Sequence, residues 1–240
     1  PPAGARRGPM TSRTPDSQFR AIRTFGRTGG RALSARQQAL VDDMLPGLTV
    51  PVGADAALDP HTLFASAGPV CLEIGFGGGE HLIEQAQRAP GTGFIGCEPF
   101  VEGMAKALTG IQENGLTNVR LWMDDARLLM ASLTDHSVDQ AFILFPDPWP
   151  KKKQQKRRLI QPDFLTELHR ILAPGARVRF ATDVASYADE ALARFLAHGG
   201  FAWQAERAGD WRTPPEDHVP TRYEAKRLGD CAPVWLDFRV

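Results

Sequence analysis

The fold of this 240-residue chain is decided by the stretch Val70-Cys-Leu-Glu-Ile-Gly-Phe-Gly-Gly-Gly-Glu80. Its first five residues are apolar enough to form a buried strand, and a helical pattern follows over residues 80–89. The glycines between them allow a sharp turn in which the backbone can approach a ligand without a Cβ in the way. The stretch therefore predicts either a binding loop for a nucleotide-like cofactor or a tight packing turn.

Strands and helices alternate outward from this stretch. Further strands are predicted at residues 93–97, 119–123, 138–145, 177–182, 201–206 and 234–240, and further helices at residues 101–114, 162–172 and 186–198. A capping box at Ser34 and Gln37 predicts an earlier helix that runs to Leu45 and is stopped by Pro46 and Gly47. This βαβ order predicts an α/β fold with a mostly parallel seven-stranded sheet and helices on both faces.

Composition supports a single domain over residues 19–240, because 42% of the chain is hydrophobic and 23% is charged. Residues 1–18 are polar and basic, and we expect them to be a disordered tail. The net charge is zero, yet residues 1–40 hold eight Arg and only one acid, Asp16. No apolar stretch approaches the length of about 18 residues that spans a bilayer, and the N-terminus lacks the apolar core of a signal peptide, so we expect a cytoplasmic protein with no membrane partner. The three Cys are an odd number and lie far apart, and two of them fall in predicted buried strands, which predicts reduced cysteines. The six His are scattered without metal-ligand spacing, which predicts no metal site.

The loop after the first strand favours a cofactor without phosphate. A dinucleotide fingerprint that begins with Gly75 and Gly77 would need a third glycine at position 80, where Glu80 stands. A carboxylate beside the helix N-terminus would repel a pyrophosphate, which argues against a dehydrogenase. Acids at Glu73 and Glu80 instead suit the cationic groups of S-adenosylmethionine.

The next two strands also end in acids. Glu98 follows the second strand, where a carboxylate can accept both hydroxyls of a ribose. Asp125 follows the third strand, where it either accepts from an adenine amine or serves as the N-cap of a helix. Three acids at successive strand ends favour the cofactor interpretation.

The fourth strand runs into Phe145-Pro-Asp-Pro-Trp-Pro-Lys-Lys-Lys-Gln-Gln-Lys-Arg-Arg158, which joins an acidic and aromatic turn to a basic run. Asp147 can accept from the ring N–H and the exocyclic amine of a guanine, and Trp149 either stacks on a base or caps the core. Six of the eight residues from Lys151 to Arg158 are basic. The run is either a clamp for phosphates or a solvated surface, and its fusion to the turn favours the clamp.

Two later segments complete the candidate site. Asp183 follows the fifth strand and places another carboxylate at the ligand-binding edge. Near the C-terminus, Thr221-Arg-Tyr-Glu224 combines a hydroxyl, a guanidinium, an aromatic ring and an acid. The Pro-rich loop of residues 213–220 precedes it and is predicted to be a lid over the substrate.

Together these segments resemble the tRNA (guanine-N7-)-methyltransferase family, a branch of the Rossmann-like class I methyltransferases. The resemblance covers residues 19–240 and rests on five motifs in family order: RTFGR near Arg23, LEIGFGGGE at Leu72, GCEPF at Gly96, FPDPWPKKKQQKRR at Phe145 and TRYEAK at Thr221. The family usually has a His pair where Gln154 and Gln155 stand.

The resemblance implies a role for each matching residue. The S-adenosylmethionine site would comprise Glu73, Gly75, Gly77, Glu98, Asp125 and Asp147, with Asp147 as the catalytic residue, an active-site carboxylate that positions the base. The substrate-binding set would comprise Lys151, Asp183, Thr221, Arg222, Tyr223 and Glu224. The implied reaction moves a methyl group to N7 of a guanine in the variable loop of tRNA, with no metal.

Two other functions compete with this reading. One is methylation of an exocyclic amine in RNA, because a similar Pro-containing turn orients amino groups. The other is RNA binding without catalysis. The expected partner in each case is tRNA or another RNA, with no obligate protein partner, and with the protein as a monomer or homodimer.

Overall fold

The computed structural model describes residues 32–53, 57–66 and 68–240. The predicted disordered tail and the motif near Arg23 lie outside the described residues, so both remain predictions. In the part that is described, no helix is long and apolar enough to cross a membrane.

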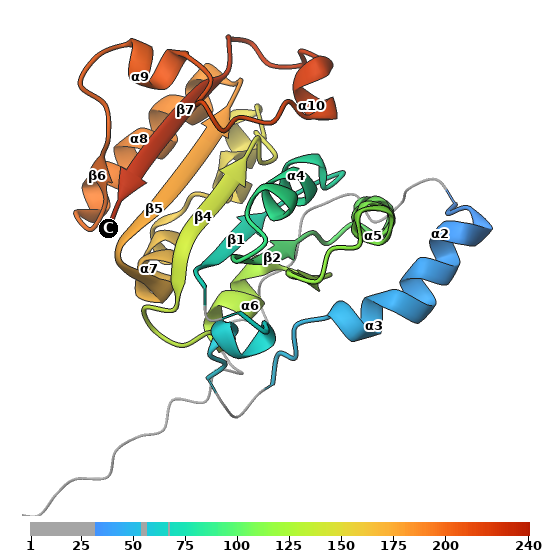
Figure 1. Ribbon diagram of the computed structural model, residues 1–240. Coiled ribbons are helices and arrows are strands. Elements are labelled where there is room, and N and C mark those ends of the chain that lie inside the picture. The colour runs from blue at the N-terminus through green and yellow to red at the C-terminus, as the bar shows by residue number, and fades with distance from the viewer. Residues whose placement is uncertain (1–31, 54–56, 67) are drawn as a thin grey trace, which may run out of the picture.

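The described residues form one seven-stranded sheet in the order β3-β2-β1-β4-β5-β7-β6 (Figure 1). The strands are β1 (Val70–Ile74), β2 (Gly93–Cys97), β3 (Val119–Trp122), β4 (Val138–Leu144), β5 (Leu172–Thr182), β6 (Ala202–Trp203) and β7 (Val234–Arg239). Neighbours from β3 through β5 are parallel, whereas β7 runs antiparallel to both β5 and β6. The predicted mostly parallel seven-stranded sheet is confirmed.

Helices cover both faces of the sheet. On one face lie α4 (Glu80–Arg88) and α5 (Val101–Asn114), and on the other lie α6 (Ala126–Ser132), α7 (Pro162–Ile171) and α8 (Ala185–His198). Alternate residues of β1 divide between the two layers, because Leu72 and Ile74 pack in the cluster of α6 to α8 while Cys71 packs in that of α4 and α5. Burial on both sides explains why this strand is almost continuously apolar.

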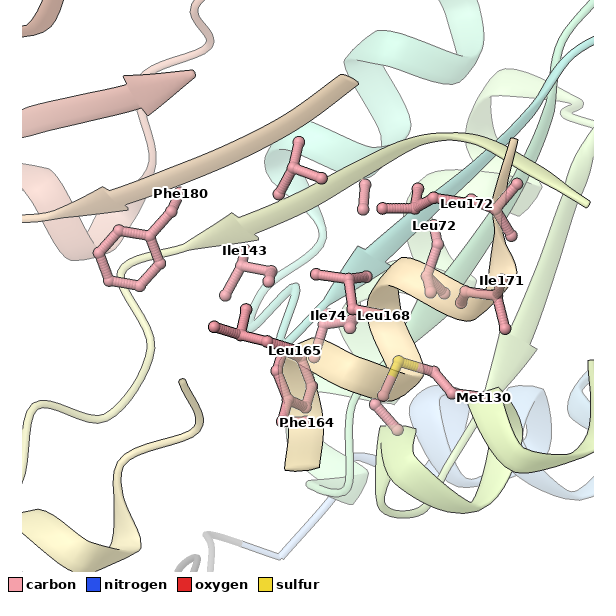
Figure 2. Packing of buried hydrophobic residues seen from close by; sticks show 14 of the residues in the cluster. Leu72, Ile74, Met130, Ile143, Phe164, Leu165, Leu168, Ile171, Leu172 and Phe180 are labelled. Carbon is pink, nitrogen blue, oxygen red and sulfur yellow. The ribbon is translucent and has the colours of Figure 1, made fainter. Parts of the chain in front are cut away.

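Figure 2 shows the larger core, in which the side chains of α7 point toward the strands. Leu165 and Leu168 are fully buried in the same cluster as Leu72 and Ile143. The apolar residues of α7 recur at helical spacing, which produces this packing face. Burying one such Leu side chain contributes about 1.5–3 kcal/mol, so the core fixes the strand ends on which the site is built.

The structure corrects several predicted boundaries. The N-terminal helical segment does not stop at Pro46 but continues as α2 (Ala35–Ala39), a π-helical turn over Leu40–Met44 and α3 (Leu45–Leu48). Pro46 is tolerated because it lies in the first turn of α3, where a missing N–H is not needed. The capping box at Ser34 is confirmed.

Differences also occur in the second half of the chain. The predicted helix end at residue 172 is wrong, because Leu172 already begins β5. Gly175 lies in this strand with a φ of +81°, and the register of β5 against β4 shifts between Val138 and Gln140. The glycine therefore resembles a loop between the helix and the strand. The edge strand β6 is shorter than predicted. The helix α6 was predicted only through the alternative in which Asp125 is an N-cap, and the short helices α9 (Gly209–Arg212) and α10 (Arg222–Ala225) were not predicted.

Cys71 and Cys97 are buried and unpaired with another cysteine, as predicted, whereas Cys231 is partly exposed.

Candidate active site

The two halves of the predicted site meet where the strand order reverses. From β1 the chain proceeds through β2 to β3 on one side, and it then returns to place β4 on the other side of β1. Ligands of open α/β sheets bind at the carboxyl ends of the strands beside such a reversal. The Gly-rich loop follows β1 and the Pro-Asp-Pro-Trp turn follows β4, so both flank this point.

The Gly-rich loop combines an open surface with a packing contact. The φ angles are +76° at Gly75, +58° at Gly77 and +82° at Gly79, a region that favours glycine. A Cβ on Gly75 or Gly77 would meet no atom within 4 Å, whereas a Cβ on Gly79 would come within 3.0 Å of Ala107 in α5. The first two glycines thus leave room for a ligand, and the third permits close helix packing.

Glu98 is buried at the end of β2 and faces the Gly-rich loop. Its carboxylate accepts hydrogen bonds from the N–H of Gly77 at 2.8 Å and the N–H of Phe100 at 3.0 Å. Burial raises the pKa of Glu98 to about 7, although these two N–H groups lower it, and the nearby charge of Asp147 raises it further. The structure therefore brings the predicted ribose acceptor and the predicted catalytic acid into one site.

Glu73 lies inside the α4 layer rather than at the open edge. Its carboxylate is 2.8 Å from Nδ1 of His81, and both side chains are almost fully buried. The His81 ring also packs edge-on against Phe142 at 4.7 Å between centroids. A contact between Glu73 and a cofactor remains a prediction, and His81 is a neighbour that the sequence motifs did not reveal.

Asp125 confirms the N-cap alternative. Its carboxylate accepts from the N–H of Arg127 at 2.9 Å at the start of α6, and it pairs with the Arg127 guanidinium at 2.5 Å. A contact with adenine stays untested.

Two apolar side chains lie at the same edge of the sheet, Val101 with 41% and Met123 with 39% of their surface exposed. The sequence did not predict this pair, because an apolar residue is expected to be buried and only the structure shows that these two are exposed.

The turn that carries Asp147 is held in an uncommon backbone conformation. Phe145 and Trp149, on either side of Pro-Asp-Pro, have φ angles of +51° and +42°. Such angles in aromatic residues persist only where the surroundings enforce them. The Asp147 side chain reaches solvent, but the protein around it removes enough water to raise the pKa of its carboxyl group. The guanidinium of Arg157 lies 5.0 Å from the centre of the Trp149 ring.

The basic run after the turn divides into two parts. Lys151, Lys152, Lys153 and Lys156 are exposed, as a phosphate clamp requires. Arg158 is only 2% exposed, and its guanidinium donates to protein oxygens. The prediction that the whole run from Lys151 to Arg158 clamps phosphates is therefore wrong at Arg158, because a buried and fully engaged guanidinium has no surface to offer.

The segment Thr221 to Glu224 lies over this site as α10. Thr221 and Glu224 form a capping box, which begins the helix. Tyr223 donates its hydroxyl to Asp183 at 3.2 Å, and its ring lies 5.5 Å from that of Phe145. Burial first, and then the Asp183 carboxylate, raise the pKa of Tyr223 to about 12.

Arg222 joins α10 to the Gly-rich loop. Its Nε lies 2.9 Å from a carboxylate oxygen of Glu80. Glu80 is thus a paired acid rather than a free charge at the helix start, which weakens the predicted repulsion of a pyrophosphate. Through Arg222 and Tyr223 the C-terminal segment contacts the loops of both β1 and β4.

The loop of residues 213–220, predicted to be a lid, is anchored to the sheet face. Asp217 pairs with Arg179 of β5 at 2.6 Å, and its carbonyl accepts from Gln85 of α4 at 3.0 Å. Arg179 also pairs with Asp237 of β7 at 2.7 Å. The segment that lies across the site is α10, and the preceding loop secures it.

Other candidate sites are weaker. A cavity of about 450 Å³ lies at the opposite ends of the strands, against Pro69, Gln140 and Arg239, and it contains none of the predicted site residues. Among the described residues, no three or more His, Cys, Asp or Glu side chains are grouped to hold a metal ion.

Solved structures of methyltransferases share the fold of this chain. The 16S rRNA methyltransferase KamB aligns with a TM-score of 0.55 over 80% of this chain and 98% of that structure, at 17% identity. A 16S rRNA (adenine(1408)-N(1))-methyltransferase W203A mutant from Catenulisporales acidiphilia, solved with its cosubstrate SAM, aligns with a TM-score of 0.54 over 80% of this chain and 96% of that structure, at 20% identity. At these identities the likeness concerns the fold.

Sequence comparison identifies the family. Residues 67–235 match the model of the family described as "Putative methyltransferase". A tRNA (guanine-N(7)-)-methyltransferase of Hyphomonas neptunium is 58% identical over 91% of this chain and 100% of the relative. The protein of the same name from Caulobacter vibrioides is 50% identical over 94% of this chain and 98% of the relative. The chain therefore belongs to the tRNA (guanine-N(7)-)-methyltransferase family.

Proposed function

We propose that this protein transfers the methyl group of S-adenosylmethionine to N7 of a guanine in the variable loop of tRNA. The observation that carries the proposal is the convergence of Glu98, Asp147 and Asp183 at one edge of the sheet, beside exposed lysines. The family membership supports the same reaction. Its setting would be the cytoplasm.

The residues around the Gly-rich loop fit S-adenosylmethionine. Open space beside Gly75 and Gly77 can receive the amino-acid end of the cofactor, and Glu98 can accept from ribose hydroxyls. Val101 and Met123 offer apolar surfaces on which a flat adenine ring would rest, with Asp125 near its amine. When bound, the cofactor supplies an electron-poor methyl group on a sulfonium.

The chain's own residues are suited to position a base rather than to remove a proton. N7 of guanine carries a lone pair and no proton, so the reaction needs no general base. Asp147 would hold the guanine by accepting from its ring N–H and its exocyclic amine. Its negative charge would also stabilise the positive charge that develops on the base, and alignment would supply most of the rate enhancement.

The elements around Asp147 would receive the rest of the nucleotide. Asp183 and Tyr223 lie on the α10 side of the turn, and Lys151 lies at the start of the basic run. The exposed Lys152, Lys153 and Lys156 would contact phosphates without reading bases. The guanine must leave its stack, at a cost of a few kcal/mol, and these contacts would offset that cost.

The test is the identity of the methylated nucleoside. Purified protein is incubated with unmodified tRNA and methyl-labelled S-adenosylmethionine, and the digested RNA is analysed by mass spectrometry. We expect label in 7-methylguanosine, none with Asp147→Ala, and none when the variable-loop guanine is replaced by adenine. Label in an exocyclic N-methylguanosine would contradict the proposal. The proposal would also be contradicted if the protein bound both tRNA and S-adenosylmethionine but left the RNA unmethylated.

A further inference from the structure

The turn that carries Asp147 cannot hold its shape through its own backbone. Proline has no N–H, so Pro146, Pro148 and Pro150 remove three of its donors. Phe145 and Trp149 add two left-handed φ angles, which are strained in non-glycine residues. Groups outside the turn must therefore enforce its conformation.

Arg158 supplies a contact of this kind. Its Nε donates to the carbonyl of Pro148 at 2.8 Å, directly after Asp147. Its other nitrogens donate to the carbonyl of Ser186 at 3.1 Å and the hydroxyl of Ser186 at 2.9 Å, and they pair with Glu190. One planar guanidinium thus joins the turn to the first half of α8.

The surroundings of Arg158 fix the guanidinium itself. It stacks on the ring of Tyr187 at 4.7 Å, and that hydroxyl accepts from the N–H of Ile160 at 3.3 Å. Tyr187 is fully buried in the larger core. The guanidinium is therefore contacted on its face by a fully buried ring and along its edges by groups of the turn and of α8.

We infer that Arg158 is a positioning residue that sets the Asp147 carboxylate for methyl transfer. This inference rests on the proposed role of Asp147. It assigns Arg158 a task different from that of the exposed lysines in the same basic run. Lysine cannot substitute for it, because a single ammonium cannot reach the Pro148 carbonyl and both Ser186 oxygens with the geometry of a guanidinium.

The first experiment compares Arg158→Lys with Lys156→Gln, a change within the same run at an exposed position. For Arg158→Lys we expect kcat to fall about 10–100-fold, since small displacements of a reacting group have effects of that size. The KM for tRNA should stay within about threefold, and the salt dependence of tRNA binding should not change. Lys156→Gln should show the opposite pattern, with a higher KM, a flatter log–log salt slope by about 0.7–0.9 and a nearly normal kcat.

A chemical rescue separates positioning from general loss of structure. In Arg158→Ala, methylguanidinium should raise kcat at least about fivefold, whereas methylammonium at the same ionic strength should not. If thermal unfolding shows that Arg158→Lys does not fold, Ser186→Ala provides the test, because it removes one acceptor of the guanidinium and leaves Arg158 in place. Ser186→Ala should lower kcat about threefold, as expected for one lost hydrogen bond of roughly 0.6 kcal/mol, with an unchanged KM.

Several results would overturn the inference. A normal kcat in Arg158→Lys with a raised KM and a flatter salt slope would make Arg158 a phosphate contact. Equal rescue by both cations, or a normal kcat in Ser186→Ala, would also reject it. Asp147→Ala is measured in parallel. If Asp147→Ala is inactive, only the inference about Arg158 has failed; if Asp147→Ala is active, the proposed function itself has failed.

Discussion

The active site has two halves, one at the ends of β1 and β2 and the other at the ends of β4 and β5, and the two halves differ in how their backbone is held. In the half formed by β1 and β2, Gly75 and Gly77 adopt left-handed angles and expose their backbone. The Glu98 carboxylate accepts hydrogen bonds from the backbone N–H groups of Gly77 and Phe100. In the half formed by β4 and β5, left-handed angles occur at Phe145 and Trp149 instead. There the turn is contacted by side chains that lie outside it, Arg158 at the Pro148 carbonyl and Tyr223 at the Phe145 ring.

The backbone conformation of the first half is supported by local sequence, whereas that of the second half is supported by tertiary contacts. Glycine adopts a left-handed angle at little steric cost, so the first half needs little external support. The second half contains strained backbone angles, and it is contacted by Arg158 and by Tyr223, whose hydroxyl donates to Asp183. We therefore expect the first half to govern affinity for the cofactor and the second to govern turnover.

The largest effect should follow a change in the second half. Asp147→Ala should lower kcat by roughly 10²–10³-fold or more, the scale for removal of a preorganised electrostatic partner. The protein should remain folded, because the Asp147 side chain reaches solvent. Single-turnover methylation of tRNA measures the effect, and turnover within about threefold of wild type, well under 1 kcal/mol, would remove Asp147 from its role.

The next effect concerns RNA rather than chemistry. Replacing Lys152, Lys153 and Lys156 by Gln should flatten the log–log salt dependence of tRNA binding by roughly two units, since each phosphate contact contributes about 0.7–0.9. The KM for tRNA should rise more than kcat falls. Arg120→Gln, at the start of β3 and away from the strands' carboxyl ends, is the control and should leave the slope unchanged. A normal slope in the triple variant would mark the run as a solvated surface.

A smaller effect tests the buried acid of the first half. The pKa of folded Glu98 is about 7 against an ordinary value of 4.5, so the folded protein retains a proton that the unfolded chain releases. The resulting stability is fully present below pH 4.5 and is lost as the pH rises through 7. Glu98→Gln cannot ionise, and it should be more stable than wild type at pH 8 by about 1–3 kcal/mol.

Urea unfolding of the ligand-free protein at pH 5 and pH 8 measures this difference. Glu84→Gln, a half-exposed acid of α4, is the matched control and should follow the wild-type curve. Parallel pH curves for wild type and Glu98→Gln would show that Glu98 does not hold the extra proton.

The smallest effect concerns backbone conformation. Gly77→Ala should destabilise the protein by about 1 kcal/mol, because alanine is strained at a left-handed angle, and it should also obstruct the ligand surface. Gly115→Ala provides a matched control, since Gly115 has a φ of +60° and equally open space but lies at the end of α5. Equal loss of stability with a loss of S-adenosylmethionine affinity only in Gly77→Ala is the expected result. Equal affinities in the two variants would exclude the loop as a binding surface.

The same division explains what the sequence could predict. The sheet, and the positions of the Gly-rich turn and of Glu98 at strand ends, follow from local patterns of strands, helices and glycines, and the structure agrees with these positions. The contacts of Arg158 and Arg222 could not be predicted, because they involve partners in α8 and α4 that only the fold brings near. Composition placed Arg158 with the exposed lysines, since a basic run carries no sign of which member is buried.

The central claim is that cofactor affinity and turnover reside in separate halves of the site. Calorimetric titration of S-adenosylhomocysteine into wild type, Glu98→Ala and Asp147→Ala tests it most directly. We predict that Glu98→Ala weakens binding by at least about tenfold, or 1.4 kcal/mol, whereas Asp147→Ala binds within about threefold of wild type while forming no 7-methylguanosine. Unchanged affinity in Glu98→Ala, or an equal loss in Asp147→Ala, would contradict the account.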